Sequence, residues 1–278
     1  MLSISLGPLA LPVAPVVLLL AVGVASWVAG FTTRRSGQGA AAGPAGDAVL
    51  HAVAAGLLAA RLVHLALHAD AYAATPWAAL DLRDGGWHAP STMAVAAAWL
   101  LWRAWRAPAL RAGLASAAAS GLLIWLAGTG ATGLQGRPPM PQVMLEALSA
   151  PAGSSPLGLS QAAAGRPVVV NLWASWCGPC REEMPMLAAA QQRESGIGFL
   201  FVNQGESAAA VAAYLAREGL PLREVWLDRR AALGPAVGSA GLPTTLFYDA
   251  QGRLVDAHFG VFNAAALQAR LQALRPPR

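Results

Sequence analysis

Long apolar segments separated by short charged clusters fill the first half of the chain, and they constrain its fold more than any other feature. Residues 1–130 contain 7 arginines and 4 acidic residues, whereas residues 131–278 contain 12 arginines and 10 acidic residues spread along their length. Charged residues make up 12% of the whole chain, against about 25% in soluble domains. We therefore expect a membrane domain over residues 1–130, a linker over residues 131–140 and a soluble domain over residues 141–278.

Four segments of the first half are candidates for membrane-spanning helices, each of which needs about 20 mostly apolar residues. They are residues 9–31, 48–69, 91–105 and 112–129. The third is the shortest, and the fourth is rich in glycine and serine, which let helices approach closely. Because no basic residue precedes Arg34, the first segment lacks the charge pattern of a cleaved signal peptide. We expect an α-helical membrane domain of about four transmembrane helices, followed by an α/β domain.

The distribution of arginine predicts the orientation, because loops rich in basic residues stay in the cytoplasm. The loop over residues 70–90 instead has three aspartates and one arginine. The basic residues of the other loops are Arg34, Arg35, Arg103, Arg106 and Arg111. This pattern predicts a multi-pass protein of the bacterial inner (cytoplasmic) membrane, with its N-terminus outside and residues 141–278 in the periplasm or extracytoplasmic space. Without the third span, residues 141–278 would lie in the cytosol.

The second segment carries three ionisable residues, Arg61, His64 and His68, whose spacing places them on one face of a helix. Ionisable groups inside a membrane are costly and usually face a bundle interior or water. Two interpretations stay open: a polar packing face, or a site for a lipid headgroup, quinone or haem.

Residues 56–90 also resemble part of the prolipoprotein diacylglyceryl transferase family. The resemblance lies in a Gly-x-x-x-Ala-Arg helix ending at Arg61 and in a loop that ends Gly-Gly-x-His at His88. The family continues His-Gly-Gly where this chain has His88-Ala89-Pro90, and the later half of that enzyme is absent. The resemblance therefore implies a shared membrane scaffold and no transferase activity.

The second half alternates apolar strand-like runs with helical segments. Residues 168–173 and 198–203 are continuous apolar runs, typical of strands buried on both faces. The other expected strands are residues 143–148, 156–160, 224–227, 244–249 and 254–261, and the expected helices are residues 181–193, 207–218 and 264–274. This order, with a Cys-x-x-Cys between the first buried strand and its helix, is that of the α/β thioredoxin fold.

Two motifs resemble the TlpA/ResA-like branch of the thioredoxin superfamily: NLWASWCGPCREEMP at residues 171–185 and GLPTT at residues 241–245. The resemblance covers about residues 141–275 and implies a thiol:disulfide oxidoreductase. It implies that Pro243 follows a cis peptide bond and places Leu242 beside the sulfurs, where its backbone can pair with an extended substrate. Glu183 matches the acidic residue of the family's CxxCxxE pattern.

The only two cysteines of the chain are Cys177 and Cys180, and their spacing brings both sulfurs to the first turn of a helix, close enough to bond as a redox disulfide. The helix N-terminus stabilises a thiolate, so we expect Cys177 to be the nucleophile. Cys180, one turn further in, would resolve the mixed disulfide. We expect Trp176 to form a docking surface for partners.

Glu183 has two interpretations, a proton acceptor or relay for the thiol pair and a solvated acid on a helix surface. Thioredoxins carry a buried aspartate two residues before the tryptophan that ends the strand, and this chain has Asn171 there. An amide cannot accept the proton, which favours Glu183.

The two cysteines have other conceivable uses besides redox exchange. A structural disulfide across two residues would stabilise little, and a zinc site needs four ligands, which this half of the chain does not supply. We expect no metal and no cofactor. The rival from another class is a copper-binding metallochaperone module, with Met184, Met186 and His258 as soft ligands beside the thiolates.

The expected function is a membrane-anchored extracytoplasmic oxidoreductase that reduces disulfides of client proteins, for example an apocytochrome c. An oxidase or isomerase of the same fold is the alternative direction. Because residues 1–130 contain no cysteine, electrons must come from a separate transmembrane thiol reductase, or from a non-thiol carrier bound at the Arg61, His64 and His68 face. The expected partners are clients, this donor and the lipid bilayer. Nucleic acid is excluded because no basic tract is interleaved with aromatics.

Overall fold

The computed structural model describes residues 2–6, 9–38, 41–73, 75–133, 137–151 and 153–275. These residues fold into two compact units, each assembled from separate parts of the sequence. The helical unit comprises Val13–Ala69 and Gly86–Gln135. The sheet unit comprises Met1–Pro12, Asp70–Gly85 and Gly136–Arg278, so it includes two pieces of the first half of the chain.

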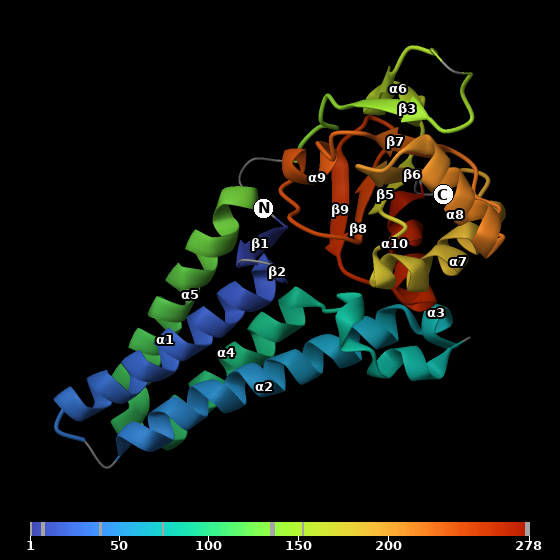
Figure 1. Ribbon diagram of the computed structural model, residues 1–278. Coiled ribbons are helices and arrows are strands. Elements are labelled where there is room, and N and C mark those ends of the chain that lie inside the picture. Colours follow the sequence, from blue (N-terminus) through green and yellow to red (C-terminus); the bar gives the residue numbers. More distant parts are fainter. Residues whose placement is uncertain are drawn as a thin grey trace. The chain divides into compact units, whose positions relative to one another are not determined.

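The helical unit contains four long helices that pack in pairs, α1 with α5 and α2 with α4 (Figure 1). Two glycines of α5 allow its close approach to α1. A Cβ atom at Gly113 would lie 2.8 Å from the Ala29 carbonyl oxygen, and one at Gly128 would lie 2.6 Å from Val17. Small residues at such positions let apolar helices pack backbone to backbone. The helices are α1 (Val13–Arg35), α2 (Ala42–Leu67), α4 (Ala89–Arg106) and α5 (Arg111–Gly133).

Among the described residues, three helical stretches are long and apolar enough to cross a membrane: Val13–Arg35, Gly43–Leu67 and Pro108–Gly128. A helical membrane domain is therefore plausible on length and composition. The expected third segment is also a helix, α4, but it is not one of these three stretches. Its two arginines, Arg103 and Arg106, lie in its last turn.

The start of the first apolar segment was predicted wrongly as helix. Leu9–Pro12 forms strand β2, which pairs antiparallel with β1 (Ser3–Leu6), and α1 begins only at Val13. Ser3 attaches this hairpin to the sheet unit, because its hydroxyl accepts a 2.7 Å hydrogen bond from the Ala240 amide. Strand pairing of this kind depends on partners distant in the sequence, which an apolar run does not reveal.

The sheet unit is built on a seven-stranded mixed sheet with the order β4-β3-β7-β6-β5-β8-β9. Strands β5, β6 and β7 are parallel, and β3, β8 and β9 run antiparallel to their neighbours. This is the expected thioredoxin-like α/β arrangement (Figure 1). The strands are β3 (Met144–Ala147), β4 (Leu157–Gly158), β5 (Val168–Trp173), β6 (Gly198–Gln204), β7 (Val225–Asp228), β8 (Thr244–Tyr248) and β9 (Leu254–Phe259).

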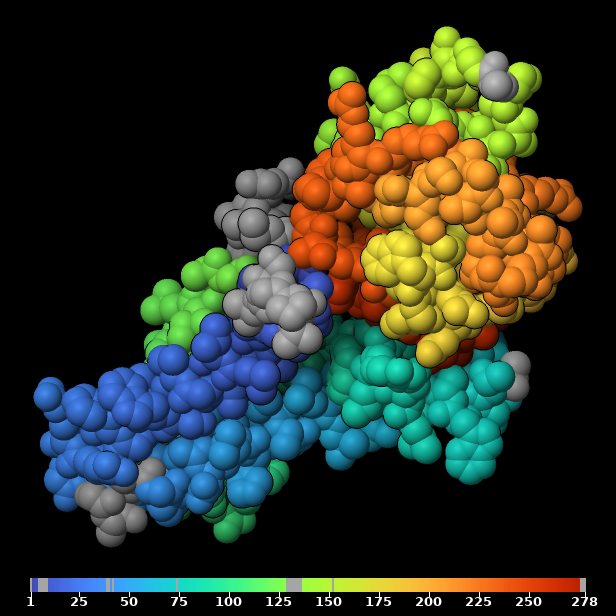
Figure 2. Space-filling view, viewed as in Figure 1, coloured from blue at the N-terminus to red at the C-terminus, as the bar shows by residue number. Residues whose placement is uncertain are grey.

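Helices cover the sheet and give it two separate apolar cores. Side chains alternate along β5, so Val169 and Trp173 enter one core while Val168 and Val170 enter the other. The first core also contains Cys177 and residues of the three longest helices of this unit, two of which, α7 and α8, are seen in yellow and orange in Figure 2. The helices are α6 (Leu159–Ala163), α7 (Gly178–Arg193), α8 (Ala208–Glu218), α9 (Leu233–Ala236) and α10 (Ala264–Leu274).

The strand predicted over residues 156–160 is wrong beyond Gly158, because Leu159 is fully buried and begins α6. In the stretch expected as a linker, the Met140 amide donates a 2.9 Å hydrogen bond to the Gly252 carbonyl oxygen, and Pro139 pairs with Arg253. These residues therefore lie along the turn between β8 and β9.

Candidate active site

The two cysteines lie where β5 gives way to α7. Strand β5 ends at Trp173, and Cys177 is the N-cap residue of α7, where its sulfur accepts a hydrogen bond from the Cys180 amide at 3.2 Å. The sulfurs are joined as a disulfide, with the Cα atoms 5.3 Å apart. Cys177 is 5% exposed and Cys180 is fully buried. Cys177 is thus the more accessible sulfur, at the end of the helix that favours a negative charge.

The Leu242–Pro243 peptide bond is cis, as predicted. Strand β8 starts at the next residue, and Thr244 pairs with Leu172 near the end of β5. This register places the Leu242–Pro243 loop at the same edge of the sheet as the cysteine loop. Leu242 also packs against the core that contains both cysteines.

The two tryptophans near the cysteines have opposite environments. Trp173 is fully buried and packs against Tyr214 with ring centroids 5.5 Å apart. Trp176 is 71% exposed, directly before Cys177. A large exposed apolar side chain beside a reactive sulfur is suited to contact a partner.

Glu183 lies one helical turn after Cys180 and is buried, which excludes a solvated acid on the helix surface. Its carboxylate accepts hydrogen bonds from the Asn171 side-chain amide at 2.8 Å and from the Phe262 backbone N–H at 3.3 Å. Burial raises the pKa of Glu183 to about 7, against the lowering effect of these two donors. A carboxyl group with such a pKa can exchange a proton at neutral pH.

Another acid, Glu206, holds the cysteine loop and was missed by sequence reasoning. Its carboxylate accepts hydrogen bonds from the backbone N–H and the hydroxyl of Ser175 and from the side-chain amide of Asn203. Ser175 lies two residues before Cys177. The available signal was the position of Glu206 just after a buried strand, at the sheet edge where the cysteine loop also begins.

Of the face formed by Arg61, His64 and His68, the first two residues lie in α2 of the helical unit, and His68 is the C-cap residue of that helix. Arg61 is buried, and its Nη1 atom donates a 3.0 Å hydrogen bond to the Gly86 carbonyl oxygen. A Cβ atom at Gly86 would lie 2.6 Å from both Arg61 and His64, while the rings of His64 and His68 lie 4.6 Å apart. These contacts fit a polar packing face, and a site for a lipid headgroup, quinone or haem on this face stays a prediction.

Of the residues expected as copper ligands, Met184 lies in the apolar core that contains both cysteines, and Met186 packs against that core. Met184 is fully buried in the core, and His258 stacks on Phe262 with ring centroids 4.2 Å apart. Burial lowers the pKa of His258 to about 4. Within the part of the chain that the structure describes, no group of three or more His, Cys, Asp or Glu side chains could hold a metal ion.

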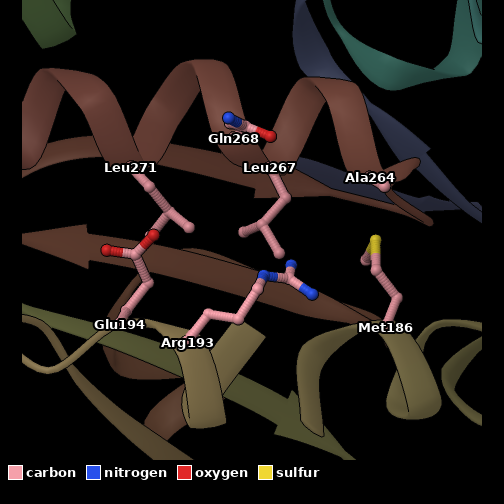
Figure 3. Close-up of a pocket in the computed structure, with 7 residues that line it drawn as sticks. All are labelled: Met186, Arg193, Glu194, Ala264, Leu267, Gln268 and Leu271. Carbon is pink, nitrogen blue, oxygen red and sulfur yellow. The ribbon is translucent and has the colours of Figure 1, made fainter. Parts of the chain in front are cut away.

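A shallow groove of about 190 Å³ lies between α7 and α10. Figure 3 shows Leu267 and Leu271 pointing from α10 toward α7, with Arg193 facing them. The groove lies along the later part of α7, whereas Cys177 is at its start. Its lining residues are Met186, Arg193, Glu194, Ala264, Leu267, Gln268 and Leu271.

A sulfur pair at a helix N-terminus can exchange electrons with another disulfide, and the fold that presents the pair is the thioredoxin fold. The sheet unit thus falls in the class of thioredoxin-fold thiol:disulfide oxidoreductases. Comparison with known proteins gives the family: the Redoxin family model matches residues 136–271, and the chain belongs to this family.

Three relatives each match part of the chain. The thiol:disulfide interchange protein HelX of Rhodobacter capsulatus is 32% identical over 134 residues, which are 48% of this chain and 73% of the relative. The thiol:disulfide interchange protein DsbE of Pseudomonas fluorescens biotype C is 35% identical over 114 residues, 40% of this chain and 63% of the relative. The thiol-disulfide oxidoreductase ResA of Geobacillus thermodenitrificans is 31% identical over 40% of this chain and 65% of the relative. The chain thus spans less than two thirds of the length of two of these relatives.

Proposed function

We propose that the protein is a membrane-anchored, extracytoplasmic thiol:disulfide oxidoreductase that reduces disulfides of client proteins. The observation that carries the proposal is the Cys177–Cys180 pair at the start of α7, with the buried Glu183 one turn further on. The names of HelX, DsbE and ResA, all proteins of thiol–disulfide chemistry, support the reaction class.

The exchange proceeds in two steps that move two electrons to the client. The Cys177 thiolate attacks one sulfur of a client disulfide, forms a mixed disulfide and releases the first client thiolate. Cys180 then gives its proton to the Glu183 carboxylate and attacks the Cys177 sulfur. The Cys177–Cys180 disulfide forms, the second client thiolate leaves, and the client is reduced while this chain is oxidised.

The client segment binds beside the sulfurs in this proposal. Trp176 supplies an exposed apolar surface, and the backbone of Leu242, held before Pro243, pairs with an extended segment of the client. An apocytochrome c awaiting haem attachment is one client of this kind.

The helical unit anchors the protein in the bacterial inner membrane. We propose that α4 is a fourth span beside the three apolar stretches, with the N-terminus outside and the cysteines in the periplasm or extracytoplasmic space. The distribution of arginine supports this orientation. The Gly56 to Pro90 likeness to the prolipoprotein transferase then reflects a shared scaffold. Because the helical unit contains no cysteine, a separate transmembrane thiol reductase is the proposed electron donor.

Trapping of clients tests the reaction and its direction. In Cys180→Ser the mixed disulfide on Cys177 cannot be resolved, so client proteins should accumulate as adducts in cells. Cys177→Ser is the matched control and should trap none. If Cys180→Ser also traps nothing, the reductase proposal fails.

The reduction potential of the full chain in detergent, equilibrated with thiol buffers, checks the direction separately. We expect a value well below about −200 mV, nearer thioredoxin than DsbA. A value near about −120 mV would mark an oxidase instead.

A further inference from the structure

The segment Asp70–Gly85 belongs to the sheet unit, although it connects two helices of the helical unit in the sequence. It folds as α3 (Ala69–Ala73), η2 (Pro76–Leu80) and η3 (Leu82–Asp84). Its last helical residue, Asp84, is fully buried. A buried carboxylate needs hydrogen-bond donors, and the structure shows where two of them come from.

The Asp84 carboxylate joins the segment to the start of α10. Its Oδ2 atom accepts hydrogen bonds from the Tyr72 hydroxyl at 2.8 Å and from the Asn263 side-chain amide at 3.1 Å. The backbone carbonyl of Asp84 accepts a third bond, from Arg270 at 3.1 Å. Asp84 is therefore held by α10 at two points.

Both α10 partners of Asp84 also fix the residue that bonds to Glu183. Asn263 directly follows Phe262 in the chain, and the Arg270 guanidinium lies 5.1 Å from the centre of the Phe262 ring. The Phe262 backbone N–H donates the 3.3 Å hydrogen bond to the Glu183 carboxylate. An unbroken set of contacts thus runs from the buried Asp84 to the acid beside the cysteines.

We propose that Asp84 is a positioning residue of the redox site, which holds the turn before α10 so that the Phe262 N–H bonds to the Glu183 carboxylate. The inference rests on the proposed role of Glu183 as proton acceptor. In this proposal the segment between α2 and α4 influences the thiol chemistry, because it helps to set the proton affinity of the Glu183 carboxylate.

The direction of the change in the proton affinity of Glu183 follows from the loss of a hydrogen-bond donor, the Phe262 N–H. A hydrogen bond donated to a carboxylate favours its charged form, so loss of the Phe262 bond raises the proton affinity of Glu183. Other charged or titratable groups stand on the elements around this acid and stay in place in the test. They are Cys180, Arg181, Glu182 and Arg193 on α7 with Cys177 at its N-cap, Asp256 and His258 on β9, and Arg270 on α10.

The test compares pH profiles of client-disulfide reduction by the full chain in detergent. Asp84→Ala removes the acceptor. Asn263→Ser removes the amide that bonds Asp84 but keeps a good N-cap for α10, so it serves where Asp84→Ala fails to fold. The control is Asp81→Ala, in the same segment, which loses an ion pair with Arg83 and the N-cap bond of η3 but keeps the Asp84 carboxylate.

We expect the apparent pKa that Glu183 contributes to the profile to rise by about one unit in Asp84→Ala and in Asn263→Ser, and to stay unchanged in Asp81→Ala. In a Glu183→Gln background the same two substitutions should cause no shift. Unshifted profiles in both variants, or a shift that persists in the Glu183→Gln background, would overturn the inference.

Failure of the proposed function has a different signature. If the unmodified chain reduces no disulfide, or if Glu183→Gln leaves the pH profile of reduction unchanged, Glu183 is not the proton acceptor. The positioning role of Asp84 is then wrong as well. If Glu183→Gln removes the titration while Asp84→Ala and Asn263→Ser do not move it, only the positioning role of Asp84 is lost.

Discussion

Asn171 and Glu183 are joined inside the sheet unit by a 2.8 Å hydrogen bond from the Asn171 amide nitrogen to the Glu183 carboxylate. The asparagine thus stabilises the charged form of an acid whose pKa burial raises to about 7. The position that holds an aspartate in thioredoxins here acts as a donor, and the proposed proton acceptor, Glu183, is on helix α7 instead of the strand.

Replacing Asn171 by leucine should raise the pKa of Glu183 further, because the side-chain donor is lost while the burial remains. At pH 7 Glu183 would then be mostly protonated, so resolution of the mixed disulfide by Cys180 should slow several-fold and recover at higher pH. Stopped-flow measurement of the second exchange step against pH checks this. Thr245→Val, which removes the other partner of the Asn171 amide, should have a smaller effect, and equal effects would contradict the assignment.

The free energy of unfolding should depend on pH through two buried groups, Glu183 and His258, whose contributions change with pH in opposite directions. The pKa of Glu183 is raised from 4.5 to about 7, so its contribution to stability falls as pH rises from about 4.5 to 7. The pKa of His258 is lowered from 6.5 to about 4, so its contribution is present above about 6.5 and is lost as pH falls toward 4. Each shift corresponds to about 3 kcal/mol, so the two largely cancel between pH 4.5 and 6.5.

Thermal unfolding of the full chain in detergent across pH 4–8 checks this balance. Glu183→Gln should lose stability as the pH falls below about 6.5, because only the His258 contribution remains. His258→Phe should instead lose stability as the pH rises toward 7. Parallel curves for both variants and the unmodified chain would contradict the assignment.

Trp176→Ala should weaken client binding with little effect on the sulfur chemistry itself. Loss of a large aromatic contact at an interface costs about 1–2 kcal/mol, so KM for a protein client should rise about 5- to 30-fold. Reduction of a small aromatic disulfide should be nearly unchanged, because it needs no docking surface. Trp77, 84% exposed in the segment between α2 and α4, offers a matched control: Trp77→Ala should leave both rates alone.

Glu206→Ala should loosen the cysteine loop. The Ser175 backbone N–H would lose its acceptor, which costs about 1–3 kcal/mol for a group away from water. We expect a lower Tm and slower attack by Cys177, measured by alkylation of the reduced chain. Ser175→Ala removes the hydroxyl and keeps the backbone hydrogen bond, so it should lower the Tm and the alkylation rate less than Glu206→Ala does. Equal decreases in both variants would assign the effect to the hydroxyl instead.

The sequence predicted the features that depend on local pattern. The apolar runs over residues 168–173 and 198–203 became β5 and β6, and the Cys-x-x-Cys spacing placed Cys177 at the start of α7. Glu183 could be singled out because it lies three residues after Cys180, where the family's CxxCxxE pattern has its acidic residue. Its role stays a prediction.

The hydrogen bonds and the strand pairing that the sequence did not reveal join residues that lie far apart in the chain. The Phe262 N–H reaches Glu183 across 79 residues, and Ser175 meets Glu206 across 31. The β1–β2 hairpin was hidden because its apolar residues read as the start of a helix, although Ser3 bonds to Ala240 across 237 residues. Burial and backbone donors of this kind appear only once the fold is known.

The division of the sheet unit among Met1–Pro12, Asp70–Gly85 and Gly136–Arg278 affects how the protein can be dissected. A protease that cuts the chain between α5 and β3 divides the sheet unit between two fragments. Met1–Pro12 and Asp70–Gly85 stay on the N-terminal fragment, and the strands from β3 onward are on the C-terminal fragment. A soluble fragment that starts near Arg137 would keep both cysteines but would lack the Asp84 partner of Asn263 and the Ser3 partner of Ala240. Redox potentials and pH profiles measured on such a fragment therefore describe an incomplete unit.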